Sequence, residues 1–585
     1  MTTQRVRALA AGIVLALAVG TSWGAGAASP AEARPPLDIN GSFIQPWVID
    51  GMTDQQLFDE VGYLSRAGMS QQIFFNTADS GRKTTVFPSG IPGYTQETST
   101  DTLGRMLTAA DEAYRTMGAC VTEYVGLQLT DEWWTKHADD EAWLNREADF
   151  AKTLAHSIWD RYGSHPSFGG WYIAFEVDNA NFTTEASWAA LARFYTKVAG
   201  HLREITPRLP IIISPFYNTH WGMDSAGWAR MWEYVLGHSS IDVIAPQDGF
   251  GAGSATTAQI AEWFAATKTA IQRSGARTDL WDNVETYADP CDPHPLDIAT
   301  VVANINAARP YVTNYLSFSY DHYDSPVLVN PAYDQTYRNY RINRVVETEP
   351  PSSPSGLAAK IIHSQEVSLE WNKSTDNIGV VGYRVFRNGV LIHTVYSTTA
   401  SFTDTTLPHM QKATYSVAAI DAAGNVSGQS GAVTVTMPYT LADVASYKTS
   451  LPADNLYPDA GKELTNRVLG APVYTDSAWQ GRSTSGSYSF TVDLGSEKIV
   501  KEVHSDWLQM RGPYIYLPAR LTVETAPNNG NFTPAGTITS PVVGQCDQSV
   551  EYRLAGLNVN ARYVRITVTP PNYVWTFTDE LEVVT

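Results

Sequence analysis

Two glutamates occupy comparable places in this chain and could act together as an acid and a base. Glu176 closes the apolar run GGWYIAFEVDN, and Glu285 closes the run LWDNVETY. In bond cleavage by two carboxyl groups, one donates a proton to the leaving group while the other attacks the substrate or activates water. Both groups must then lie at the same end of the fold, so the elements that carry them decide whether they can cooperate.

Those elements form a regular alternation of short apolar runs and amphipathic stretches from residue 41 to about 343. Between the apolar runs, Thr53 and Asp101 are typical of helix N-caps, and Gly68 and Gly118 of helix ends. Apolar strands separated by helices indicate a parallel sheet covered by helices. The predicted strands are GSFIQPW, QQIFFN, ACVTEYVGL, GGWYIAFEVDN, PIIISPFYN, DVIAPQDG, TDLWDNVETY and VTNYLSFSY.

Eight such repeats predict a (β/α)8 barrel, the TIM-barrel fold, over residues 38–343. A doubly wound open sheet is the alternative, but no glycine-rich dinucleotide motif follows the first strand. In the barrel, Glu176 ends strand four and Glu285 ends strand seven. The carboxyl ends of barrel strands share one face, so the two glutamates are predicted to meet there.

The other predicted strand ends carry amides, carboxylates and aromatic rings, with scarcely any cation. This composition favours a neutral polyhydroxyl substrate, because amides and carboxylates bond hydroxyl groups while Trp and Tyr faces stack on sugar rings. Asp248 is a third catalytic candidate, either replacing Glu285 or orienting Glu176. Asp178 could raise the pKa of Glu176 or cap the following loop. The predicted substrate-binding residues are Gln45, Trp47, Asn76, Trp134, Asp178, Tyr217, Asn218, Gln247, Trp281, Asn283, Tyr320 and His322.

The placement of the two glutamates resembles a large clan of retaining glycosidases built on (β/α)8 barrels. That resemblance implies that Glu176 is the acid/base and Glu285 the nucleophile. The clan usually has Asn immediately before the strand-four glutamate, whereas this chain has Phe175. Residues 41–343 also resemble a group of secreted bacterial glycosidase-like barrel domains with no settled activity, through the run GWYI-x-x-E.

Two further modules are predicted after a Pro/Ser-rich linker at 344–355. Residues 356–437 resemble a fibronectin type III module through Leu369-Glu370-Trp371 and Tyr415, and we expect it to act as a spacer. Residues 440–585 resemble a discoidin-like (coagulation factor 5/8 type C) sandwich through Trp479-Gln480-Gly481, TVDLGS, ARYVRITV and DELEV. That resemblance implies a carbohydrate-binding module, often with structural calcium, and makes Asp459 and Glu580 the predicted calcium ligands.

The N-terminus predicts export. Arg5 and Arg7 precede an apolar stretch too short to span a bilayer, and small residues follow it, so residues 1–28 are predicted to be a signal peptide. The formal net charge of −20 disfavours nucleic acid or an anionic membrane as partner. Three cysteines allow at most one intramolecular disulfide and leave at least one thiol. We expect a secreted monomer that does not insert into a membrane.

Together these patterns predict a secreted glycoside hydrolase that acts on a polysaccharide or cell-surface glycan without a catalytic cofactor. A non-catalytic glycan-binding or adhesion protein is the main alternative. A polysaccharide lyase is less favoured, because it usually needs a cation or a metal to neutralise a uronate and the strand ends supply few cations.

Overall fold

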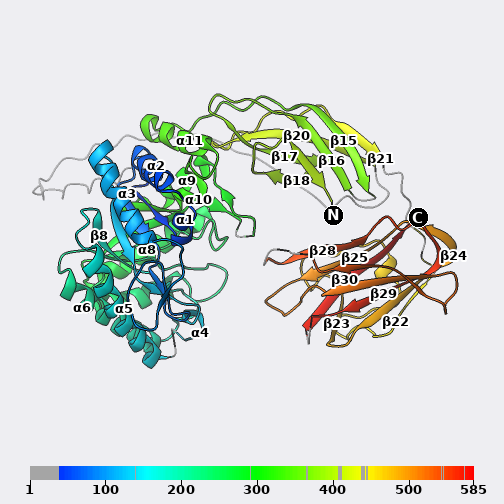
Figure 1. The fold of residues 1–585 in the computed structure, drawn as a ribbon, viewed down its shortest axis with the longest axis horizontal. Coiled ribbons are helices and arrows are strands. Elements are labelled where there is room, and N and C mark those ends of the chain that lie inside the picture. The colour runs from blue at the N-terminus through cyan, green and yellow to red at the C-terminus, as the bar shows by residue number, and fades with distance from the viewer. Residues whose placement is uncertain are drawn as a thin grey trace, which may run out of the picture.

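The computed structural model describes residues 38–585 except 137, 139, 290, 364–365, 406–411, 437–441, 443, 445, 542, 544–545 and 572–573. The predicted signal peptide at 1–28 lies outside the described residues. Three domains follow one another in an arc, with the barrel at one end and the C-terminal domain at the other (Figure 1). No helix in the described part of the chain is long and apolar enough to cross a membrane.

The first domain is a closed barrel of eight parallel strands, which confirms the predicted fold class. The order around the barrel is β1-β14-β11-β10-β9-β8-β6-β2, and β1 closes the ring by pairing with both β14 and β2. Seven strands fall within predicted runs, and β8 begins one residue before its run, at Phe168. The strands are β1 (Gly41–Ile44), β2 (Gln71–Phe74), β6 (Thr122–Gly126), β8 (Phe168–Ile173), β9 (Ile211–Ile213), β10 (Val243–Ile244), β11 (Asp279–Glu285) and β14 (Asn314–Phe318).

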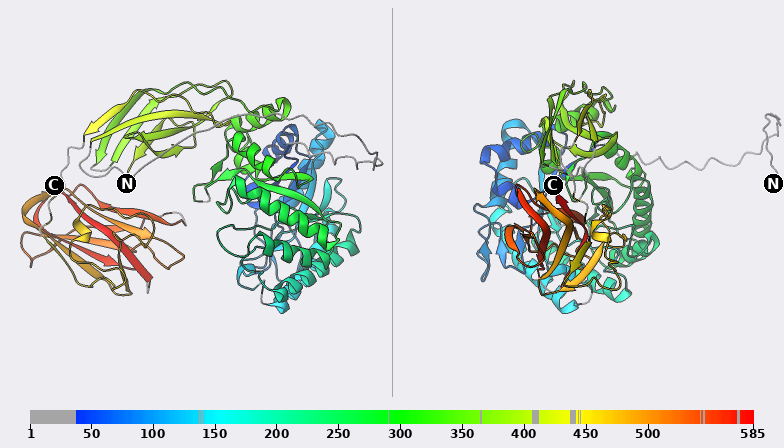
Figure 2. Two further views of the ribbon diagram at one scale, coloured as in Figure 1. Left: turned by 180° about the vertical axis from the view of Figure 1, so that it is seen from behind. Right: turned by 90° about the vertical axis from the view of Figure 1, so that its right-hand side faces the viewer.

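A layer of helices surrounds the barrel (Figure 2). Thr53 and Asp101 cap the helices that follow them, as predicted, and Gly118 ends a helix in the left-handed conformation with φ 69°. The long helices are α2 (Asp54–Arg66), α3 (Thr102–Met117), α5 (Glu141–Tyr162), α6 (Glu185–Ile205), α7 (Ser225–Gly237), α8 (Thr257–Ser274), α9 (Ile298–Ala308) and α11 (Pro331–Asn343). Short helices are α1 (Pro46–Asp50), α4 (Trp133–Lys136) and α10 (Tyr320–Tyr323).

The loops that follow the carboxyl ends of the barrel strands contain short strands of their own. One four-stranded sheet, in the order β5-β4-β3-β7, joins the loops after β2 and β6. Its strands are β3 (Ala78–Asp79), β4 (Thr84–Thr85), β5 (Thr95–Gln96) and β7 (Gln128–Leu129). A two-stranded hairpin of β12 (Tyr287–Ala288) and β13 (His294–Pro295) follows β11.

Alternation along each strand separates the barrel interior from the layer between strands and helices. In β8, Tyr172 packs inside with Phe43 and Trp281, and Ala174 just beyond the strand joins the same cluster. Trp171 faces the helices, where its Nε1 donates to Thr206 Oγ1 at 2.8 Å. Even-numbered residues of this segment therefore face inward, and Glu176 continues that series.

The middle domain packs two antiparallel sheets around one core that includes Trp371, Tyr383 and Tyr415. The Tyr415 hydroxyl donates to Asp404 Oδ2 at 2.7 Å. The sheets are β15-β16-β19 and β18-β17-β20-β21. Their strands are β15 (Ser355–His363), β16 (Glu366–Asn372), β17 (Val380–Arg387), β18 (Val390–Val395), β19 (Ser401–Asp404), β20 (Lys412–Asp421) and β21 (Val433–Thr436).

The C-terminal domain also packs two antiparallel sheets face to face, around Phe490, Trp507 and Ile566. The sheets are β22-β24-β29-β26-β27 and β23-β30-β25-β28. A short 3-10 helix, η1 (Glu463–Thr465), packs on β30. The strands are β22 (Ser446–Thr449), β23 (Gln480–Thr484), β24 (Tyr488–Val500), β25 (Glu502–Gln509), β26 (Arg520–Ala526), β27 (Thr533–Thr539), β28 (Gln548–Leu554), β29 (Val559–Thr569) and β30 (Val574–Val584).

Two glycines, one in a barrel strand and one on an exposed helix face, test how tightly the barrel is packed. A Cβ on Gly126, in β6, would lie 2.1 Å from the backbone oxygen of Phe75, which cannot move without disturbing the neighbouring strand. We expect Gly126→Ala to destabilise the barrel by about 3 kcal/mol. Gly200, on the exposed side of α6, meets nothing within 4 Å, so Gly200→Ala should stabilise the protein by about 0.5–1 kcal/mol. Thermal unfolding followed by tryptophan fluorescence measures both; equal melting temperatures for the two variants would contradict the packing argument.

Candidate active site

A small cavity of about 40 Å³ lies at the carboxyl ends of the barrel strands. It would hold only about three water molecules, so it can enclose reacting groups but not a whole sugar ring. A sugar chain would have to lie across the open mouth above it. The lining residues are Phe43, Phe75, Tyr172, Glu176, Ser214, Gln247, Asn283, Tyr287 and Phe318.

Glu176 enters this cavity from the segment that follows β8. Its Oε1 accepts a hydrogen bond from Gln247 Nε2 at 2.8 Å, and its backbone oxygen accepts one from Trp133 Nε1 at 2.5 Å. Burial raises the pKa of Glu176 to about 7; the Gln247 bond lowers it and the charge of Asp178 adds to the rise. The side chain is therefore poised to hold or give up a proton near neutral pH.

Neutral polar groups hold Gln247, the hydrogen-bond partner of Glu176, in place. Gln247 lies just beyond β10 and forms an isolated parallel bridge with Asn283, which extends the pairing of β10 with β11. Asn283 Nδ2 donates to Ser214 Oγ at 3.0 Å, and Ser214 Oγ donates to the carbonyl of Ala245 at 2.8 Å. Strands β9, β10 and β11 thus hold the amide that bonds Glu176 in a defined place.

Glu285, the last residue of β11, is buried beside two other acids. Its Oε2 accepts the backbone N–H of Ala252 at 2.7 Å, which favours the ionised form. Burial raises its pKa, and the charge of Asp248 followed by that of Glu176 adds to the rise. Glu285 is therefore electrostatically linked to Glu176, as expected for two strand ends on one face of the barrel.

Asp248 and Asp282 complete this acidic cluster behind the cavity. Asp248 Oδ1 accepts the backbone N–H groups of Phe250 at 3.0 Å and Glu285 at 3.4 Å. Both Asp282 oxygens are buried and have no hydrogen-bond partner among the described residues. Burial, with the charges of Asp248 and Glu285, raises the pKa of Asp282 well above its ordinary value. We infer that Asp282 holds a proton. The pKa values of Asp248 and Glu285 are raised by burial too, and the N–H bonds that these two groups accept favour their ionised forms.

Phe175 explains why the residue before Glu176 departs from the retaining-glycosidase pattern. Its ring stacks on Trp133 with centroids 4.6 Å apart and an interplanar angle of 1°. It also packs against Trp143 and Phe194 in the layer between strands and helices. Position 175 therefore points away from the cavity, and the amide that bonds Glu176 here is Gln247.

Three predicted substrate-binding residues have side chains packed away from the cavity. Tyr217 stacks on Trp263 at 4.5 Å and donates to the carbonyl of Asp248. Tyr320 donates to Asp334 Oδ1 at 2.8 Å, on the helix side of the barrel. Trp281 is only 8% exposed and packs within the barrel interior, in edge contact with Tyr124. We therefore no longer count these three among the groups that could contact a substrate.

Other predicted residues shape the loops around the mouth. Asp178 is fully buried and its Oδ1 accepts the N–H groups of Ala180 and Asn181, so it caps the loop, one of the two roles considered for it. Asn218 Nδ2 donates to Ser254 at 3.3 Å and Asn76 Nδ2 to the carbonyl of Ala78 at 3.5 Å.

Two further predicted residues remain near the strand ends. Gln45 is buried at the N-terminus of α1, and its Oε1 has no hydrogen-bond partner among the described residues. His322, in α10, contacts Ser319 Oγ and Asp321 through Nδ1. Of all the predicted site residues, Glu176, Gln247 and Asn283 line the cavity itself.

Three exposed tryptophans lie in segments that follow the carboxyl ends of barrel strands. Trp47 follows β1, Trp134 lies in α4 after β7, and Trp221 lies in the loop after β9. Their side chains are 59%, 45% and 52% exposed. The first two were predicted substrate contacts, and Trp221 was not. In the barrel order β1 and β9 lie on opposite sides, so Trp47 and Trp221 approach the mouth from opposite directions.

Sequence reasoning missed the aromatic wall of the cavity. Tyr172 precedes Glu176 by four residues and Tyr287 follows Glu285 by two, so both share the inward register of the glutamates. Extending the two-residue period of each strand from its glutamate would have identified them. The same period relates Phe43 to Gln45 and Phe318 to Tyr320, two predicted site residues, so these rings could have been identified too. Phe75 offered no such signal, because no predicted site residue lies two residues from it.

The predicted calcium ligands of the C-terminal domain are already engaged. Asp459 Oδ2 pairs with Arg482 Nη2 at 3.1 Å, and the Tyr447 hydroxyl donates to Asp459 Oδ1. Glu580 Oε2 accepts the backbone N–H of Arg467 at 2.9 Å. The described residues contain no group of three or more His, Cys, Asp and Glu side chains that could hold a metal ion. Calcium stays a prediction, and no step below depends on it.

A larger hollow of about 620 Å³ lies elsewhere on the barrel, between α2, α3 and α5, and is lined by Asp54, Arg105 and His165 among others. The smaller cavity remains the candidate active site, because it is the one at the carboxyl ends of the strands.

Comparison with known proteins gives the following. Residues 39–330 match the family described as "Domain of unknown function (DUF4434)". An alpha-amylase of Niallia circulans is 47% identical over 154 residues, which is 26% of this chain and 11% of that protein. Chitinase Chi52 of Paenibacillus xylanexedens is 48% identical over 90 residues, which is 15% of this chain and 17% of that protein.

The chain therefore spans less than a fifth of the length of either relative. Among solved structures, the endo-beta-1,4-mannanase from Thermotoga petrophila aligns over 69% of this chain and 98% of its own, at 11% identity and a TM-score of 0.34.

The inferred protonation of Asp282 predicts a particular dependence of stability on pH. Because its pKa is raised in the folded protein, it favours folding most below about pH 4, and this contribution is lost as pH rises toward the folded pKa. Asp282→Asn removes that titration, so its melting temperature should fall less than that of the parent between pH 4.5 and pH 8. Asp279→Asn, at the exposed start of the same strand, is the matched control and should follow the parent. Parallel curves for Asp282→Asn and the parent would refute the assignment.

Proposed function

We propose that this protein is a secreted glycoside hydrolase that cleaves O-glycosidic bonds of a polysaccharide or cell-surface glycan. Glu176 acts as the acid/base, and Glu285 acts as the nucleophile or as the base that activates water. The observation that carries the proposal is the pair itself: Glu176, half-buried just beyond the end of β8, lines the cavity, and Glu285, fully buried, ends β11. No catalytic cofactor is needed for this reaction.

In the first step, Glu176 protonates the glycosidic oxygen as the bond to the anomeric carbon breaks. A pKa of about 7 supports this role, since it keeps a large fraction of the group protonated near neutral pH. The bond from Gln247 Nε2 favours the carboxylate that forms when the proton leaves. Glu176 can then take a proton from the water that completes the reaction.

Glu285 supplies the second carboxylate. The Ala252 N–H bonds one oxygen, Oε2, and holds the group in place. Burial also raises the pKa values of Glu285 and Asp248, and the backbone N–H bonds that both accept favour the carboxylate forms. Asp248 Oδ1 accepts the backbone N–H of Glu285 itself, so we assign Asp248 a role in positioning Glu285.

The substrate class follows from the lining and the rim. Amides, carboxylates and aromatic rings at the strand ends suit a neutral glycan, and the cavity is too small for a sugar ring. We therefore propose that Trp47, Trp134 and Trp221 provide stacking surfaces across the mouth, since all three are exposed. The two relatives reported above are named as an alpha-amylase and a chitinase, which supports carbohydrate as the substrate class.

The two outer domains have roles in the same proposal. The middle domain would act as a fibronectin type III spacer and the C-terminal domain as a discoidin-like carbohydrate-binding module. Tethering raises the effective concentration of enzyme at its substrate without new catalytic contacts. The main alternative is a non-catalytic glycan-binding protein, which the first experiment below separates from an enzyme.

A glycan panel tests the reaction and both glutamates. The parent should release reducing ends from at least one neutral polysaccharide, and Glu176→Gln and Glu285→Gln should each lower kcat by about 10²–10⁴-fold. Glu204→Gln removes an exposed carboxylate that pairs with Lys152 at 3.2 Å, far from the strand ends, and should match the parent. No hydrolysis by the parent, with glycan binding retained, would favour the non-catalytic alternative.

The pH profile tests the assignment of the acid. Because Glu176 must be protonated to act, kcat/KM should fall as the pH rises through about 7. Gln247→Leu removes the bond that favours the Glu176 carboxylate, so the descending limb should move up by about one pH unit. The limb is measured on a small soluble substrate between pH 5 and pH 9. A limb that stays in place in Gln247→Leu would show that another group supplies the proton.

A further inference from the structure

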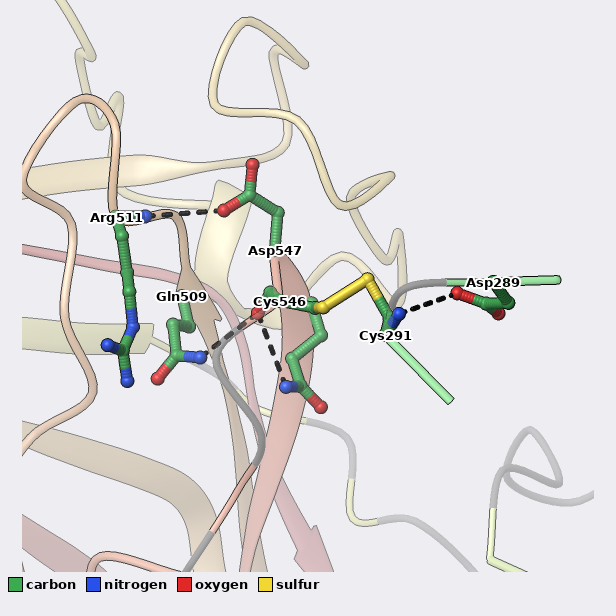
Figure 3. Close-up of a disulfide and its surroundings, with 7 residues drawn as sticks. Asp289, Cys291, Gln509, Arg511, Cys546 and Asp547 are labelled. Atoms are coloured by element: carbon green, nitrogen blue, oxygen red, sulfur yellow. Dashed lines mark hydrogen bonds between the residues drawn. A yellow bond between two sulfur atoms is a disulfide. The ribbon is translucent and has the colours of Figure 1, made fainter. Parts of the chain in front are cut away.

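A disulfide joins two domains that are far apart in the sequence. Cys291 lies in the barrel domain and Cys546 in the C-terminal domain, 255 residues later. Their Cα atoms are 5.6 Å apart, within the usual range for a disulfide. Figure 3 shows the bridge between the two segments. Cys120 is exposed and free, in line with the prediction of at most one bridge and at least one remaining thiol.

On the barrel side, the bridge is attached to the rim of the candidate active site. Cys291 lies in the turn between β12 and β13, the hairpin that follows β11 and Glu285. Tyr287, at the start of this hairpin, lines the catalytic cavity and stacks on Tyr323 with centroids 5.2 Å apart. At the far end of the hairpin, His294 stacks on Tyr396 of the middle domain at 3.6 Å.

On the other side, the bridge is attached to a well-anchored loop. The carbonyl of Cys546 accepts hydrogen bonds from Gln509 Nε2 at 3.0 Å and Gln548 Nε2 at 3.3 Å, and Asp547 accepts the N–H of Arg511 (Figure 3). These contacts tie the loop to β25 and β28, so the position of Cys546 is rigidly related to the four-stranded sheet.

A hollow of about 600 Å³ lies directly beside this loop. It is bounded by β27, β28 and the loop around Leu469, with Thr405 of the middle domain at its edge. Asp579, in β30, is 1% exposed and lines it; Oδ2 accepts the N–H of Gly470 at 2.6 Å, whereas Oδ1 has no hydrogen-bond partner among the described residues. Such a buried acceptor in a polar hollow is suited to a hydroxyl donor from a ligand.

The hollow offers the same types of polar group as the barrel mouth. Gln548 and Ser549 offer amide and hydroxyl groups, and Asp506 offers a further carboxyl group. Arg553 also lines the hollow, and its Nη2 pairs with Glu366 of the middle domain at 2.9 Å. Amide, hydroxyl and carboxyl groups together match the hydroxyl groups of a neutral sugar chain rather than an anion.

Among the described residues, the disulfide is the direct covalent contact between the barrel and the domain that carries this hollow. The middle domain is held to the barrel by an apolar contact of Tyr333 with Val381 and Ile420, and by the bond from Ile298 N to the carbonyl of Ala422. The C-terminal domain meets the middle domain through the Arg553–Glu366 pair, whose side chains are 24% and 20% exposed. A partly exposed ion pair holds two domains weakly, so the covalent bridge is the strongest link between the barrel and the C-terminal domain that the described residues show.

We propose that this hollow binds a stretch of glycan and that the Cys291–Cys546 disulfide holds it beside the catalytic rim, so that barrel and C-terminal domain engage one chain. The inference rests on the proposed glycosidase function for the cleavage step only. The binding surface and the clamp are properties of the C-terminal domain and the bridge. A long chain would occupy both sites, whereas a short oligosaccharide would occupy only the barrel.

Four variants test the proposal. Cys291→Ser with Cys546→Ser removes the bridge, and Ser549→Trp fills the hollow from an exposed position on β28. Cys120→Ser, a cysteine before the amino end of β6, and Thr537→Trp, an exposed position on β27 that is not among the lining residues, are their matched controls. Mass spectrometry after alkylation should find one reactive thiol in the unreduced parent; three would overturn the clamp.

The double cysteine variant should show a larger radius of gyration by small-angle X-ray scattering, and Ser549→Trp and both controls should not. On a long polysaccharide, kcat/KM should fall about tenfold in the double cysteine variant and in Ser549→Trp, with no change on a short oligosaccharide. Unchanged scattering without the bridge, or equal losses on long and short substrates, would overturn the proposal.

The two proposals fail in different ways. If the parent hydrolyses no glycan in the panel, the proposed glycosidase function is wrong. The glycan-binding site is then tested by measuring binding alone. Long-oligosaccharide binding, measured by calorimetry, should then weaken about tenfold in Ser549→Trp and remain at the parent level in Thr537→Trp. Equal affinity in the two tryptophan variants would overturn the site.

Discussion

Closure of the eight-stranded barrel is the constraint on which the rest of the structure depends. Once β1 pairs with both β14 and β2, every strand has one face toward the interior and one toward the helices. Tyr172, Ala174 and Glu176 then face inward, whereas Trp171 and Phe175 face outward. The same alternation in β11 places Asn283 and Glu285 on the inner series and Asp282 on the outer one. The chemistry available at the mouth follows from that register.

A second consequence is the burial of acids without cations. Asp248, Asp282 and Glu285 are all 2% exposed or less, and no lysine or arginine is among the groups that shift their pKa values. Three such carboxyl groups cannot all remain ionised in one buried cluster, so protons must be retained. Backbone N–H groups from the loop after β10 stabilise negative charge on the Asp248 and Glu285 oxygens that they bond. The site is thus organised by amides and backbone dipoles, which suits chemistry on a neutral substrate.

The outer domains extend this organisation beyond the barrel. The hairpin after β11 carries Tyr287 at the cavity, His294 against the middle domain and Cys291 in the disulfide to the C-terminal domain. One short segment beside the second glutamate is therefore in contact with all three domains. The arc in Figure 1 is closed at this point by a covalent bond, which makes the C-terminal sheet a neighbour of the catalytic rim.

Local sequence patterns predicted the eight strands, the helices with their caps at Thr53 and Asp101, and the position of Glu176 and Glu285 at the carboxyl ends of the fourth and seventh strands. These features depend on local periodicity and capping chemistry, which adjacent residues encode. Gln247 and Asn283 were also predictable, because they lie near the carboxyl ends of predicted strands. Tertiary structure decided the rest: that Tyr217 and Tyr320 turn toward the helices, that Trp281 fills the interior, that Gln247 bonds Glu176, and that Cys291 pairs with Cys546. Each of these is a contact between segments distant in the chain, where the direction of a side chain depends on which neighbour leaves room for it, and no local pattern records that neighbour.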